Sequence, residues 1–71
     1  MRRAILNALR ARYEAEIAEA DATANIYLSN SVGIGEHPQH IDEVNKLIDK
    51  IAQAKEKLAV LEEFEPERSV L

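Results

Sequence analysis

The sequence of 71 residues lacks cysteine and tryptophan altogether, and it holds only two glycines, two prolines and three other aromatic residues. Without cysteine, neither disulfides nor thiolate-bound metals can stabilise the fold. The length is about half that of a usual domain, so the chain forms one small domain or part of an assembly. A single core of this size is marginal unless a partner chain adds to it.

The chain also has no excess of basic residues, because it contains 9 Lys and Arg and 13 Asp and Glu, which gives a net charge of −4. This balance argues against general nucleic-acid binding, which needs a basic face. No run approaches the roughly 18 apolar residues of a membrane span. The start resembles a signal peptide only briefly, since Asn7 and Arg10 interrupt the apolar run. These features, with the lack of cysteine, predict a cytoplasmic protein without membrane association.

Both glycines and one proline fall between residues 30 and 38, which divides the chain into two long stretches free of these breakers. We predict a helix over 2–29, a loop over 30–37 and a helix over 38–64, forming one hairpin domain over 1–65. Pro66 blocks continuation of the second helix, and residues 66–71 are expected to form a flexible tail.

The first stretch is rich in helix formers and has apolar residues at steps of three and four, so that an eleven-residue repeat emerges. Its predicted stripe consists of Leu6, Leu9, Tyr13, Ile17, Ala20, Ala24 and Leu28. Alternation over residues 24–28 resembles a short strand, but no partner strand exists, so the helical interpretation is preferred.

The second stretch repeats its apolar residues in heptads, as in a coiled-coil seam. The seam consists of Val44, Leu47, Ile51, Ala54, Leu58 and Leu61. Ile41 and Ile48 widen the stripe at its start. Pro38 suits the first helical position, and Asp42 and Glu43 place negative charge near the first turn.

Two helices of similar length joined by one short loop predict an all-α fold, an antiparallel two-helix hairpin. This arrangement lays the arginine-rich residues 1–12 beside the acidic end of the second helix, whose carboxylates are Glu62, Glu63, Glu65 and Glu67. Exposed pairs contribute little energy, so these charges select orientation more than they stabilise.

A lone hairpin would leave several apolar residues beside the seams in water, namely Ile5, Ile26, Tyr27, Ile48, Val60 and Phe64. We therefore expect a homo-oligomer, in the simplest case two hairpins in a four-helix bundle. The residues expected to form its seam are Leu6, Tyr13, Ile17, Val44, Leu47, Ile51, Leu58 and Leu61.

His37 and His40 are candidate metal ligands because they stand three residues apart, beside Glu36 and Asp42. A structural site normally needs four ligands, and no further clustered set is visible. The preferred interpretation is that His37 caps the second helix and His40 is solvated. Nearby, the Gly33–Gly35 segment follows a helix and lacks a third glycine, so it is not a nucleotide-binding fingerprint.

A basic belt around one level of the hairpin is the best candidate for anion binding. It consists of Arg10, Arg12, Lys55 and Lys57, with Tyr13 close by. Arginine and an aromatic ring suit phosphate and base contacts, and the belt is expected to lie away from the acidic tail. Neighbouring Glu14, Glu16 and Glu56 favour the competing interpretation, a solvated face with ordinary i,i+4 pairs.

Catalysis has no support in the sequence. Ser29, Ser31 and Ser69 lack a histidine and carboxylate at any spacing that a nucleophile needs. We expect neither an enzyme nor a cofactor.

The segment Asn30-Ser31-Val32-Gly33-Ile34-Gly35-Glu36-His37 resembles the loop of small helical-hairpin proteins encoded by tailed bacteriophages, marine ones especially, which share a G-I/V-G-E-H pattern. The resemblance covers residues 3–63, and the loop is its specific part. It implies phage origin, a host bacterial cytoplasm and no established enzymatic role.

Three classes of function remain open. The first, preferred class is a homo-oligomeric module that binds a host or phage protein. The second is a counter-defence sponge that sequesters an anionic nucleotide signal, which the basic belt favours. The third is a minor virion or assembly component.

Overall fold

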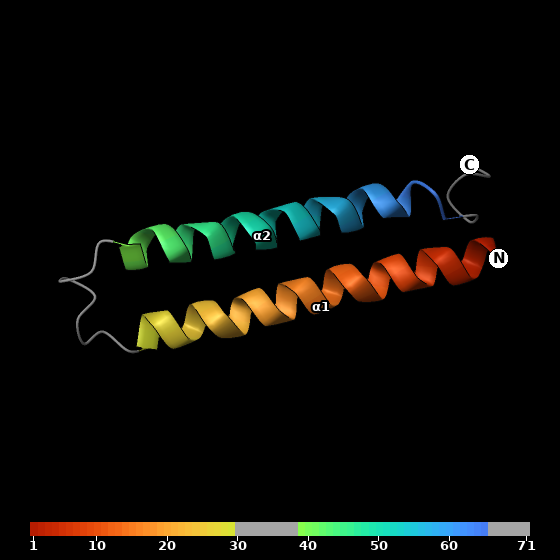
Figure 1. The fold of residues 1–71 in the computed structure, drawn as a ribbon. Coiled ribbons are helices and arrows are strands. Elements are labelled where there is room, and N and C mark those ends of the chain that lie inside the picture. Colours follow the sequence, from red (N-terminus) through yellow and green to blue (C-terminus); the bar gives the residue numbers. More distant parts are fainter. Residues whose placement is uncertain (30–38, 66–71) are drawn as a thin grey trace.

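The computed structural model describes residues 1–29 and 39–65 and shows an all-α fold in which two helices pack antiparallel as a hairpin (Figure 1). Helix α1 spans Arg2–Ser29 and helix α2 spans Gln39–Glu62. The molecule is elongated, with extents of 54 × 18 × 14 Å. The predicted fold class is therefore confirmed. The predicted loop over 30–37, the first predicted residue of the second helix, Pro38, and the predicted tail over 66–71 lie outside the described residues.

Helix α1 has the predicted bounds, and residues 24–28 are helical, not a strand. Helix α2 ends two residues earlier than predicted. The N–H groups of Glu63, Phe64 and Glu65 donate to carbonyls three residues back, at 2.9, 3.0 and 3.1 Å. These short-range bonds tighten the final turn and satisfy carbonyls that a helix end leaves open. Pro66 follows directly and disfavours an α conformation at Glu65, which explains the early end.

The core between the helices is narrow and consists largely of small side chains. In the described part of the chain, five hydrophobic residues are buried, namely Leu6, Ala20, Ala24, Ala54 and Leu61. Ala20 and Ala54 are each only 1% exposed, so the helix backbones approach closely at these points. The rest of the seam expected for an oligomer, Tyr13, Ile17, Val44, Leu47, Ile51 and Leu58, is half-buried. This burial arises within one hairpin, so these residues form the contact between α1 and α2 of a single chain.

Leu28 departs from the predicted stripe, because its side chain is 65% exposed while Tyr27 is half-buried. The reason is geometric. Each four-residue step turns about 40° past a full helical turn. Two such steps in succession, from Ala20 through Ala24, carry Leu28 to the edge of the contact, and a three-residue step brings Tyr27 back.

Both helices leave large apolar side chains in solvent. Those at least 46% exposed are Met1, Ile5, Ile26, Leu28, Ile41, Ile48, Val60 and Phe64. A lone hairpin is expected to expose the apolar residues beside the seams to solvent. This expectation is confirmed for Ile5, Ile26, Ile48, Val60 and Phe64, whereas Tyr27 is half-buried. Assembly into a bundle stays a prediction.

Candidate functional site

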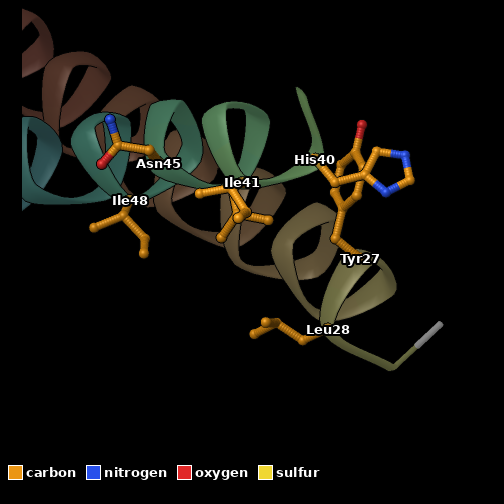
Figure 2. Close-up of a pocket in the computed structure, with 7 residues that line it drawn as sticks. Tyr27, Leu28, His40, Ile41, Asn45 and Ile48 are labelled. Atoms are coloured by element: carbon orange, nitrogen blue, oxygen red, sulfur yellow. The ribbon is translucent and has the colours of Figure 1, made fainter. Parts of the chain in front are cut away.

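An apolar groove runs along α2 near its beginning and takes in the end of α1. We call it the Ile48 groove, and its lining residues are Tyr27, Leu28, His40, Ile41, Val44, Asn45 and Ile48. Its volume is about 310 Å³. Figure 2 shows that Leu28 from α1 and Ile41 and Ile48 from α2 lie on the same side of the hairpin. None of the lining residues is an acid, a lysine or an arginine.

Two of the residues that line the Ile48 groove form an aromatic pair. The rings of Tyr27 and His40 meet edge to face, with centroids 5.5 Å apart and planes at 61° (Figure 2). His40 is half-buried. The expectation of a solvated His40 is therefore wrong, because Tyr27 faces α2 at the position where the stripe was predicted to continue with Leu28.

A second groove lies near the chain termini, and we call it the Phe64 groove. Its lining residues are Leu6, Leu9, Tyr13, Glu56, Lys57, Val60, Leu61 and Phe64, around about 390 Å³. Lys57 Nζ lies 5.5 Å from the centroid of the Tyr13 ring, within the range of a cation–π contact. This groove therefore combines apolar walls with one acid and one cation.

A third hollow of about 300 Å³ is lined by Thr23, Tyr27, Glu43, Lys46, Leu47 and Lys50. Lys46 Nζ lies 3.5 Å from a Glu43 carboxylate oxygen, as an i,i+3 pair on α2. This hollow is mainly a charged surface.

The Ile48 and Phe64 grooves open on opposite sides of the hairpin. Ile48 stands six residues before the buried Ala54, and Val60 stands six residues after it. At about 100° per residue, the two side chains turn about 120° away from Ala54 in opposite senses. The hairpin thus has two partly apolar faces. The lining of the Ile48 groove contains no acid, lysine or arginine, whereas the lining of the Phe64 groove contains Glu56 and Lys57.

The end of α2 is held to the start of α1 through Glu65, which is only 9% exposed. Arg3 Nη1 lies 2.8 Å from one oxygen of the Glu65 carboxylate, and Arg10 Nη2 donates to the other. Arg2 Nη2 also donates to the carbonyl oxygen of Phe64. The predicted juxtaposition of the basic and acidic ends is confirmed. We call this group of contacts the Glu65 clasp.

The arginines lower the pKa of Glu65 below its ordinary value of 4.5. The hydrogen bond from Arg3 is the largest cause, burial of the carboxyl group opposes it, and the charges of Arg3 and Arg10 add to it. Glu65 is therefore held in its ionised form.

The candidate anion-binding belt is not assembled as a single site. The expectation that it lies away from the acidic end is wrong for Arg10, because Glu65 bonds to it. Residues two apart on a helix project about 200° from each other, so Arg10 and Arg12 point to different sides, as do Lys55 and Lys57. Arg12 and Lys55 are exposed. Tyr13 and Lys57 are the members that the structure does bring together.

For the metal candidates, His37 lies outside the described residues, and His40 packs against Tyr27. Across residues 1–29 and 39–65, no three His, Asp or Glu side chains gather as a metal would require. Over the same described segments, neither helix has the length and apolar character needed to cross a membrane.

Comparison with known proteins adds no family: no protein-family model, curated protein or solved structure matches the chain. Sequence reasoning identified Ile41 and Ile48 as apolar residues beside the seam, but it placed Leu28 inside the seam and gave no role to Asn45.

Proposed function

We propose that this protein is a non-enzymatic helical interaction module that works as a homo-oligomer, encoded by a tailed bacteriophage and active in the cytoplasm of the bacterial host. The observation that carries the proposal is the imbalance between core and surface. Within residues 1–29 and 39–65, three of the five buried hydrophobic residues are alanines, whereas eight large apolar side chains are at least 46% exposed.

Such a hairpin gains little from its own core. Burying apolar surface contributes about 25 cal/mol per Å², and alanine offers little area. The large side chains that would contribute most, such as Ile41, Ile48 and Phe64, stay more than half exposed. Association between hairpins would bury part of this apolar surface, which is the usual way in which short helical chains reach stability.

Phage origin and host cytoplasm are supported by the resemblance of residues 30–37 to the loops of phage-encoded helical hairpins. A host or phage protein is the expected target of the assembled module. Two exposed apolar faces support this role, since one face can serve self-association while the other stays available to a partner.

Sedimentation equilibrium combined with circular dichroism over a range of protein concentrations tests the oligomer. We expect an oligomer at micromolar concentration and a loss of helicity on dilution, because folding depends on association. A chain that stays monomeric and fully helical at micromolar concentration would refute the proposal.

A second candidate function is a sponge for an anionic nucleotide signal, favoured by Lys57 Nζ over the Tyr13 ring. The ammonium group of a lysine can bind a phosphate, and an aromatic ring beside it can stack on a base. Salt-dependent nucleotide binding by the purified protein separates this candidate from the interaction module.

A further inference from the structure

We propose that the Ile48 groove is the surface through which two copies of this chain associate, about a two-fold axis that passes beside Asn45. This inference rests on the proposed homo-oligomeric function and names the surface that carries it. The Phe64 groove, on the other side of the hairpin, then stays exposed to solvent or contacts another partner.

Charge is the first argument. In a two-fold contact, the residues beside the axis lie close to their own copies, so a lysine or glutamate there meets a like charge. The Phe64 groove is lined by Glu56 and Lys57, and the third hollow by Glu43, Lys46 and Lys50. The Ile48 groove has no acid, lysine or arginine in its lining. Of the three surfaces, it is the one whose lining has no acid, lysine or arginine that could meet its own copy at the axis.

Spacing along α2 is the second argument. Ile41, Asn45 and Ile48 follow one another at steps of four and three, and the exposed Ala52 continues the series. This is a heptad stripe beside the one that faces α1, and it extends for about 17 Å along the helix. Leu28, 65% exposed, adds an apolar side chain from α1 to the same face.

Asn45 supplies the third argument, because it is a polar residue in the middle of the apolar stripe. A carboxamide carries both donors and acceptors, so it can pair with its own copy across a two-fold axis. A single asparagine in a helical seam fixes the register and the number of chains at some cost in stability. The stripe therefore has the composition of a specific self-contact.

The small core favours a second copy of this chain, and not a foreign protein, as the partner that binds the Ile48 groove. Among the residues that the structure describes, Leu6 and Leu61 are the only large hydrophobic side chains that are buried, so the hairpin needs additional burial whenever it is folded. A second copy is present wherever the chain is made, whereas a foreign partner is not. Self-association through the uncharged face meets this need at all times.

Disulfide trapping tests the inference directly, because the chain has no cysteine and a single introduced cysteine can cross-link only between chains. Asn45→Cys places the thiol beside the axis, within the short Cα separation that a disulfide demands. Val60→Cys is the control, because Val60 is an exposed residue of the Phe64 groove and lies about 22 Å along α2 from Asn45. We expect Asn45→Cys to form covalent dimers at least about tenfold faster than Val60→Cys under mild oxidation.

A second pair of variants measures the same contact without cross-linking. Ile48→Asp places two like charges in the contact, so we expect the dimer dissociation constant from sedimentation to rise at least about tenfold. Val60→Asp should change it by less than about threefold. Should Ile48→Asp fail to fold at all while Val60→Asp folds normally, that contrast also supports the contact.

The outcomes separate the inference from the function on which it rests. The wild type can be oligomeric while Val60→Cys cross-links as fast as Asn45→Cys, or while neither variant cross-links. Either result would show that the Ile48 groove is not the contact surface, and the proposed homo-oligomer would still stand. A wild type that is folded and monomeric overturns both.

Discussion

Arg3 and Glu65 stand 62 residues apart in the sequence, yet the Arg3 guanidinium donates to the Glu65 carboxylate at 2.8 Å. The contact closes the open end of the hairpin, where α1 begins and α2 has just ended. Glu65 accepts from Arg10 as well, so one carboxylate holds two points on α1. Charge-assisted bonds of this kind are stronger than neutral ones when they are partly shielded from water.

Removing the charge of Glu65 should destabilise the hairpin. Glu65→Gln keeps the shape of the side chain but removes the ionic contacts that Glu65 makes with Arg3 and Arg10. We expect the thermal midpoint to fall by several degrees in calorimetry at neutral pH. Glu63→Gln is the control, since Glu63 is exposed and should leave the midpoint nearly unchanged. Equal effects of the two substitutions would mean that the Glu65 clasp contributes nothing specific.

The clasp should also make stability depend on pH. The pKa of Glu65 is lower in the folded protein than its ordinary value of 4.5, because Arg3 and Arg10 favour the carboxylate. A lowered folded pKa gives a contribution that is complete above the ordinary pKa and disappears as pH falls through the folded one. The urea midpoints of wild type and Glu65→Gln should therefore differ at pH 7 and converge as pH falls below 4.5. A gap that stays constant down to pH ~3 would contradict this account.

Nucleotide binding, if the sponge function holds, should depend on Lys57. Its ammonium group lies against Tyr13, so Lys57→Glu should abolish binding in isothermal titration and leave helicity intact. Lys50→Glu is the control, because Lys50 is an exposed cation on the same helix. Reversing Arg12 and Lys55 together tests the wider belt. Binding that survives all of these changes would show that the belt is only a solvated surface.

The hairpin could be predicted from the sequence because apolar periodicity and helix breakers act locally. The heptad spacing from Val44 to Leu61 identifies the face of α2 that meets α1, and the structure places those residues there. The same reasoning failed at Leu28, where small angular drifts accumulate over several turns. Which of Tyr27 and Leu28 faces the partner helix depends on where that helix lies.

The clasp and the Ile48 groove needed the structure for a different reason. Several glutamates near the end of α2 look equivalent in sequence, and only the tightened turn after Glu62 directs Glu65 toward α1. Likewise, Leu28 and Ile48 belong to different helices, and their common side follows from the packing of the hairpin (Figure 2). Charge pattern alone indicates which ends meet, not which side chains do.

The close approach of the two helices predicts how the alanine core will respond to a larger side chain. Ala20 is 1% exposed, so Ala20→Leu has no space and should push α1 away from α2. Overpacking of this kind typically costs about 1–3 kcal/mol, measured by urea unfolding at a fixed protein concentration. Ala15→Leu on the same helix is the control, because Ala15 is exposed and the change should stay within about 0.5 kcal/mol. An Ala20→Leu protein as stable as wild type would mean that the helices lie further apart than this packing requires.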